Sequence, residues 1–171
     1  MLPRKITRLT NSSVIRSLAL MLVAATMVGG GLILQATAQQ HHTVVAGDAV
    51  KWGPAPPSLP PGAQAAVLLG SPAKDGPFVI RLKFPAGYIV PPHRHSKDEF
   101  VTTISGRFLI TTGEKVDRAS LKPLPPGSFF HLPAGMAHYA WAEVESVVQV
   151  SGMGPFDVVY IDPKDDPRKK D

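Results

Sequence analysis

At 171 residues, the chain has the length of one domain with short extensions. The absence of cysteine excludes a disulfide framework, a thiolate metal site and a cysteine nucleophile. The formal net charge of +5 depends on four basic residues within positions 1–38, and the other 133 residues carry 14 basic and 13 acidic side chains. That near-neutral balance excludes electrostatic attraction to nucleic acid or to anionic membranes as the basis of function.

Residues 1–38 have the composition of a secretory signal peptide. Basic residues between Arg4 and Arg16 precede the apolar run Leu18–Leu34, and the pattern Ala36-Thr37-Ala38 follows it. We expect Sec-type export, because the basic region has no Arg-Arg pair, with cleavage after Ala38 and delivery to the periplasm or the exterior. The alternative is an uncleaved membrane anchor, although 17 apolar residues lie near the shortest length that spans a bilayer.

Residues 39–64 form a proline-rich N-terminal arm. Its prolines exclude a helix or a central strand, because proline lacks the N–H that both ladders need. The arm is either ordered and packed across the domain, with Trp52 as an anchor, or a flexible linker. After cleavage, His41 would be the third residue, beside His42. A free amine, two amides and an imidazole suit square-planar Cu(II) or Ni(II), and a disordered tail is the alternative interpretation.

Residues 65–162 are predicted to be all-β. Short apolar or alternating runs are separated by Gly and Pro turn signals, at residues 65–70, 77–87, 99–106, 107–113, 128–135, 138–143, 146–152 and 156–162. Short strands at this spacing predict a sandwich or a barrel. Residues 163–171 are polar, and we expect them to form a solvated C-terminal tail.

The stretch from Phe84 to Gly106 carries the strongest chemical signal. His93, His95 and Glu99 share one parity, so in an extended strand their side chains point to the same face. Two imidazoles and a carboxylate on one face form half of a metal site. A second stretch, Gly127–His138, places His138 after a Pro-x-Gly turn. A barrel that closes His138 onto the first three residues would complete the site.

The two stretches fit Gly87-x5-His93-x-His95-x3-Glu99-x6-Gly106 and Gly127-x5-Pro133-x-Gly135-x2-His138. This pattern resembles the cupin family. The resemblance implies a double-stranded β-helix, a jelly-roll barrel, with one divalent metal ion held by His93, His95, Glu99 and His138. It also implies a homodimer. The family often has Asn four residues after the last His, where this chain has Ala142. That departure removes a hydrogen-bonding side chain and no ligand.

Other polar residues near the motifs receive no firm role. The direction of His131 does not follow from its spacing, because the Pro133–Gly135 turn separates it from His138. Asp98 has the opposite parity to Glu99 and is expected to point away from the site. Gln149 either points into the barrel, as a contact to metal ligands or substrate, or lies on the sheet surface.

A site of three imidazoles and one carboxylate suits Fe, Mn, Zn, Ni or Cu, and in an octahedral ion it leaves two positions open. The resemblance therefore implies a metal-dependent enzyme acting on a small molecule. Few general acids or bases lie near the motifs, which favours dioxygenase-type oxidation of an enolic or phenolic compound over non-redox decarboxylation or isomerisation. The mature domain also resembles the cupin half of zinc-binding anti-sigma factors, so a binding or sensing protein without turnover is the alternative.

Overall fold

The computed structural model describes residues 42–169. The predicted signal peptide, its cleavage site and His41 lie outside this range, so export stays a prediction. Within the described residues, no helix is long and apolar enough to cross a membrane.

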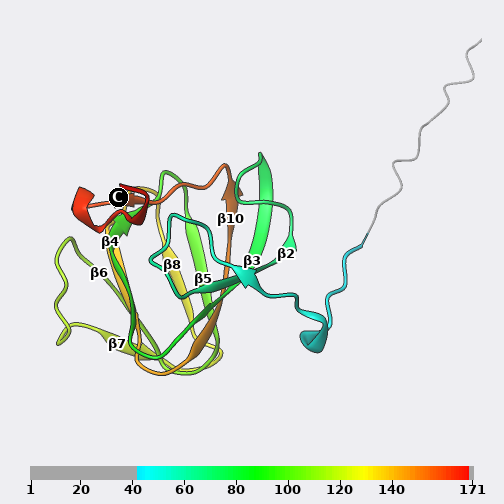
Figure 1. Ribbon diagram of the computed structural model, residues 1–171, viewed down its shortest axis with the longest axis horizontal. Coiled ribbons are helices and arrows are strands. Elements are labelled where there is room, and N and C mark those ends of the chain that lie inside the picture. The colour runs from blue at the N-terminus through cyan, green and yellow to red at the C-terminus, as the bar shows by residue number, and fades with distance from the viewer. Residues whose placement is uncertain (1–41, 170–171) are drawn as a thin grey trace, which may run out of the picture. The chain divides into compact units, whose positions relative to one another are not determined.

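Two antiparallel sheets make up the domain and face each other around one core (Figure 1). The first, in spatial order, consists of β1 (Gly53–Pro54), β2 (Gln64–Leu69), β3 (Gly76–Phe84), β10 (Ser146–Gly154), β5 (Glu99–Ser105) and β8 (Phe129–Leu132). The second consists of β11 (Val159–Tyr160), β4 (Tyr88–Arg94), β9 (His138–Ala142), β6 (Phe108–Thr112) and β7 (Lys122–Leu124). The short 3-10 helix η1 (Gly47–Ala49) precedes β1. The predicted all-β jelly-roll fold is confirmed.

Each of the eight runs predicted to be strands contains one. The structure adds β1, β4 and β7, and every one of these contains proline: Pro54, Pro91 with Pro92, and Pro123. β1 and β7 are edge strands, where proline is tolerated because one side of the strand has no partner. β4 lies inside its sheet, and its register with β9 shifts between Val90 and His93, across the two prolines. Proline thus marks edges and a bulge here without preventing strand formation.

Alternation along β3 fills the core. Phe78, Ile80, Leu82 and Phe84 are buried, while Arg81 and Lys83 point outward. The same inward pattern in β10 buries Val148 and Val150. These side chains pack with buried residues of β4, β5, β6 and β9 into one cluster between the sheets. Burying this apolar surface is the main driving force for bringing the two sheets together.

The proline-rich arm is ordered over its described part. β1 pairs with β2 at the sheet edge, and Lys83 Nζ lies 4.5 Å from the ring centroid of Trp52. The hydroxyl of Tyr160 donates to the carbonyl of Ser58 at 2.7 Å, and that of Tyr88 donates to the carbonyl of Pro60. The arm is therefore fastened across the barrel, and of the two alternatives the ordered arm holds.

The polar segment expected to be a free tail is folded up to Lys169. It contains the 3-10 turns η2 (Pro163–Asp165) and η3 (Pro167–Lys169). Arg168 pairs with the buried Asp166 at 2.7 Å and donates to the carbonyl of Val158 at 2.8 Å. These contacts tie the C-terminal segment to the chain beside β11.

Candidate metal centre

The bulge in β4 aims His93, and His95 just after the strand, at the interior. Tyr88 and Val90 are buried, and strict alternation would then turn His93 to the outside. The extra residue at Pro91–Pro92 reverses the alternation, so His93 is buried as well. His95 follows directly after the strand and is also buried. Two prolines therefore set the direction of the first two predicted ligands.

Glu99 comes from the opposite sheet, which corrects the sequence argument. That argument assumed one extended strand from His93 to Glu99, but β4 ends at Arg94 and β5 begins at Glu99. The chain bends at Ser96 and Lys97 and crosses between the sheets. The residues nevertheless converge, because the bend turns Glu99 back toward the interior. His138 begins β9 and lies directly opposite His93 in the register.

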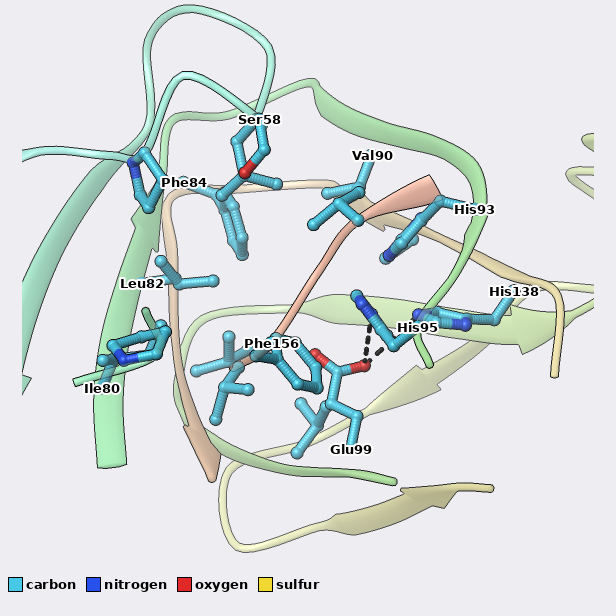
Figure 2. A pocket seen from close by; sticks show the side chains of 18 of the residues that line it. Ser58, Ile80, Leu82, Phe84, Val90, His93, His95, Glu99, His138 and Phe156 are labelled. Carbon is cyan, nitrogen blue, oxygen red and sulfur yellow. Dashed lines mark ion pairs between the residues drawn. The ribbon is translucent and has the colours of Figure 1, made fainter. Parts of the chain in front are cut away.

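The four predicted ligands meet in one buried cluster (Figure 2). The three imidazoles each offer a nitrogen within 4.8 Å of the other two. Glu99 Oε2 joins them at 3.4 Å from His95 Nε2 and 3.3 Å from His138 Nε2. Among the described residues, His95 Nε2 has no aligned hydrogen-bond partner although it is buried. An orphaned nitrogen lone pair beside two imidazoles and a carboxylate is what a divalent metal ion would satisfy.

Backbone carbonyls hold all three rings in the orientation that a metal needs. His93 Nδ1 lies 2.7 Å from the carbonyl of Pro91, His95 Nδ1 lies 2.5 Å from that of Asp157, and His138 Nδ1 lies 3.0 Å from that of Met136. A carbonyl only accepts, so each Nδ1 carries the proton and each Nε2 keeps its lone pair. This support of the ligands is typical of histidine metal sites.

A segment beside β11 supports His95, and the sequence reading missed it. The Phe156 ring stacks on the His95 ring at a centroid distance of 4.3 Å. Asp157 Oδ1 accepts from the backbone N–H of Ser96 at 2.7 Å and from its hydroxyl at 2.8 Å. Asp157 thus holds the bend after His95 with its side chain and the ring itself with its carbonyl. No sequence signal identified this contact, because the two segments lie about 60 residues apart.

The electrostatics of the cluster favour a neutral His93 beside a charged Glu99. Burial, with His138 and His95 nearby, lowers the pKa of His93 from 6.5 to about 3. Burial alone would raise the pKa of Glu99, but the imidazoles of His138 and His95 beside it hold that pKa well below its usual range. Burial opposes protonation of His95, yet the negative charge of the adjacent Glu99 raises its pKa overall.

The cluster opens into a cavity of about 290 Å³. Most of its lining is apolar, and three lining residues come from the arm. Beyond the four predicted ligands, the cavity is lined by Pro56, Ser58, Leu59, Ser71, Pro72, Ala73, Ile80, Leu82, Phe84, Val90, Val101, Phe108, Ile110, Ala140, Val148, Val150, Phe156 and Val158. Figure 2 places Ile80, Leu82 and Phe84 on the side opposite the histidines.

The remaining sequence candidates lie outside the site. His131 pairs with Asp98 at 3.1 Å on the exposed face, so both point away from the cavity. Gln149 lies on the outer face, with its Oε1 3.4 Å from Arg81 Nε. Ala142, which stands where the family often has Asn, is buried in the core. His42 is exposed.

Comparison with known proteins gives one family and a set of shared folds. Residues 80–159 match the model of the family described as the cupin domain. A search of curated proteins found no match.

Among solved structures, the polyketide cyclase RemF from Streptomyces resistomycificus is 16% identical, with a TM-score of 0.58 over 74% of this chain and 90% of that one. An acetylacetone dioxygenase from Acinetobacter johnsonii is 19% identical, with a TM-score of 0.55 over 73% and 80%. KdgF from Halomonas sp. is 21% identical, with a TM-score of 0.51 over 66% and 94%. At these identities the likeness establishes the fold. Residues 80–159 therefore contain a cupin domain, and the barrel shares its fold with these solved structures.

Proposed function

We propose that this protein is a mononuclear-metal enzyme that oxidises a small enolic or phenolic molecule with O₂. The observation that carries the proposal is a buried set of three imidazoles and one carboxylate that opens into an apolar cavity. His93, His95, Glu99 and His138 would hold the ion. A redox-active ion bound there would supply a site for the substrate and the means of electron transfer to O₂.

The chain's own residues prepare the site in three ways. The carbonyls of Pro91, Asp157 and Met136 keep Nε2 of each ring free for the metal. Glu99 contributes one negative charge. The apolar lining offers water few hydrogen bonds, and a substrate that displaces water there would strengthen electrostatic interactions inside the cavity.

Proton-transfer chemistry has less support in this cavity. Of the lining residues that the structure describes, only the four predicted ligands carry an acidic or basic side chain. A decarboxylase or isomerase that moves protons would need a further general acid or base near the substrate. One structural neighbour is named an acetylacetone dioxygenase, which agrees with oxygen chemistry on this fold. Fold likeness alone does not fix the reaction.

Export to the periplasm or exterior, with assembly as a homodimer, completes the proposal. Outside the cytoplasm, intrinsic affinity favours Cu and Zn over Fe and Mn, so heterologous expression can load a metal other than the working one.

The test is elemental analysis of protein isolated from its native compartment, followed by oxygen consumption with enolic and phenolic compounds. We expect one equivalent of a redox metal and oxygen uptake that is lost in His138→Ala and kept in His131→Ala. Tightly held zinc without oxygen uptake would contradict the proposal and indicate a non-redox enzyme or a sensing protein.

A further inference from the structure

The cavity has one polar end and one apolar end. The predicted metal ligands gather on one side, and Ile80, Leu82 and Phe84 lie across from them (Figure 2). Any molecule that reaches the metal must place its remaining atoms against hydrocarbon. Contacts of this kind favour an apolar group and provide nothing for a polar one.

No cationic side chain is available to receive a second negative charge. Among the described residues that line the cavity there is no Lys, Arg, Asn or Gln. Arg81 and Lys83 belong to a strand of the cavity wall but alternate to its outer face, where they contact Gln149 and Trp52. A carboxylate or phosphate in the apolar part would therefore be buried without a partner, which is strongly unfavourable.

Neutral hydrogen-bonding groups are almost as scarce. The hydroxyl-bearing residues of the lining are Ser58 and Ser71, and Ser71 Oγ already accepts from the backbone N–H of Ala73 at 3.3 Å. A sugar presents several hydroxyl groups, and each would lose its hydrogen bonds to water on entering. Polyhydroxylated molecules are therefore poor occupants.

Charge and size narrow the class further. A divalent ion with three neutral imidazoles and one carboxylate has a net charge of +1, which a ligand with a single negative charge neutralises. The volume of about 290 Å³ corresponds to ~10 water molecules at ~30 Å³ each. The occupant therefore has on the order of ten non-hydrogen atoms.

We propose that the site selects small monoanionic chelators, enolates or phenolates that offer two oxygens to the metal, whose remaining atoms are apolar and uncharged. It discriminates against the same chelating group when that group carries a carboxylate, a phosphate or several hydroxyls. This inference rests on the proposed function for the metal-bound end of the ligand, and on the cavity lining for the rest.

The test measures binding separately from turnover. The full protein is loaded with Co(II), whose visible spectrum responds to a new ligand, and is titrated with a matched pair. The pair is 4-isopropylcatechol and 3,4-dihydroxybenzoate, which share the chelating group and differ in an alkyl or a carboxylate branch of the same shape. We expect at least tenfold tighter binding of the alkyl compound. Equal or tighter binding of the carboxylate compound, or no spectral change with either, would overturn the inference.

A positive charge placed in the cavity wall should weaken the preference for the alkyl catechol over the carboxylate catechol. Leu59 lies in the arm, outside the strands, and packs partly buried against the core, so Leu59→Lys adds a cation to the lining without altering a strand. We expect this variant to reduce the ratio of the two dissociation constants, carboxylate catechol over alkyl catechol, at least threefold. The control is Leu69→Lys on β2, an exposed position outside the lining, which should keep the wild-type preference. The same preference in both variants would contradict a role for the lining.

Oxygen consumption by the Fe(II)-loaded protein separates the two proposals. Selective binding of the alkyl catechol without oxygen uptake would refute the proposed oxidation with O₂. It would support the proposed selection of apolar monoanionic chelators. Oxygen uptake that is equally fast with both catechols would support the proposed oxidation with O₂. It would refute the proposed selection of apolar monoanionic chelators.

Discussion

Asp98 and Glu99 are adjacent in sequence, and each pairs with histidine, yet the two clusters have different properties. Glu99 Oε2 lies 3.4 and 3.3 Å from His95 and His138 in the interior, whereas Asp98 lies 3.1 Å from His131 on the outer face. The side chains of His131 and Asp98 are 42% and 50% exposed, and that of His138 is 2% exposed. Similar distances therefore do not make similar sites. Burial and the convergence of several ligands distinguish the inner cluster.

The largest effect is expected from His138→Ala. The variant removes a ligand that lies directly opposite His93 and should lose nearly all bound metal. It should also lose the stabilisation that the metal provides, about 4 kcal/mol if the free metal is at 1,000 times its Kd. Elemental analysis and thermal unfolding with and without added metal measure both effects. Wild-type metal content in this variant would refute the ligand assignment.

Charge removal from each carboxylate tests the comparison directly. Glu99→Gln keeps the shape of the side chain but removes the negative charge beside His95 and His138. We expect its metal affinity to fall by more than the ~10–100-fold typical of losing a supporting contact. Asp98→Asn is the matched control and should bind metal as the wild type does. Competition with a chromophoric chelator gives both metal affinities. An equal loss of affinity in the two variants would show that Glu99 has no special role in metal binding.

Acid should destabilise the metal-free protein through the inner cluster first. The pKa of His93 is about 3 in the folded chain and ordinarily 6.5, so below pH 6.5 the unfolded chain takes up a proton that the folded chain does not. The stability associated with His93 is complete above pH 6.5 and is lost toward pH 3, by at most about 1.4 kcal/mol per pH unit. The lowered pKa of Glu99 likewise makes the folded chain lose stability as the pH falls below 4.5. The raised pKa of His95 has the opposite effect and stabilises the folded chain in acid.

Urea titrations of metal-free protein between pH 7 and pH 4 check this prediction. In His93→Gln the loss of stability over this range should be smaller than in the wild type. Asp98→Asn should keep the wild-type loss, because the pKa of Asp98 is lowered from 3.8 by the N–H of Ala134 and by His131, and its contribution changes only below that range. An unchanged pH dependence in His93→Gln would show that other groups control acid stability.

A smaller effect is expected from Asp157→Ala. The variant keeps the carbonyl that accepts from His95 but loses the carboxylate that holds Ser96. The ring should become less well positioned, and metal affinity should fall ~10-fold with little change in metal-free stability. Asp157→Asn retains an oxygen acceptor and should recover most of the affinity. Equal affinities in the Ala variant and the wild type would exclude this positioning role.

The smallest effect belongs to the outer pair. His131→Ala removes an exposed contact with Asp98, and exposed pairs of this kind typically contribute less than about 1 kcal/mol. Metal content should remain at the wild-type level, and the melting temperature should change by only a few degrees. Loss of metal in this variant would show that the exposed His131 contributes to metal binding as the buried histidines do.

The sequence was sufficient for the fold and for the identity of the inner residues, but the route by which they meet was not predictable from it. Strict alternation fails twice in the first motif, at the Pro91–Pro92 bulge and at the bend before Glu99. The two deviations preserve the inward direction of all four predicted ligands, so these residues converge although the local picture behind the prediction was wrong. Bulges and bends depend on pairing with distant strands, which single-chain periodicity does not contain.

Contacts between distant segments were the least predictable part. Asp157 and Phe156 surround His95, but the sequence showed them only as part of an ordinary apolar run. The arm was predicted as either ordered or flexible, and its contribution to the cavity lining was missed. Composition indicates that a proline-rich segment lacks ladder hydrogen bonds, but which carbonyls then meet which hydroxyls is a matter of tertiary structure.

The two tyrosine anchors of the arm have a consequence for how this cavity can change. Tyr88 and Tyr160 bind backbone carbonyls of the arm, at Pro60 and Ser58, and make no use of its side chains there. Substitution at Leu59 therefore leaves both anchoring acceptors in place while it alters the cavity wall. The attachment and the ligand preference are separable, so mutation can vary one without undoing the other. A change at this position of the arm can therefore alter the preferred ligand while both backbone anchors remain.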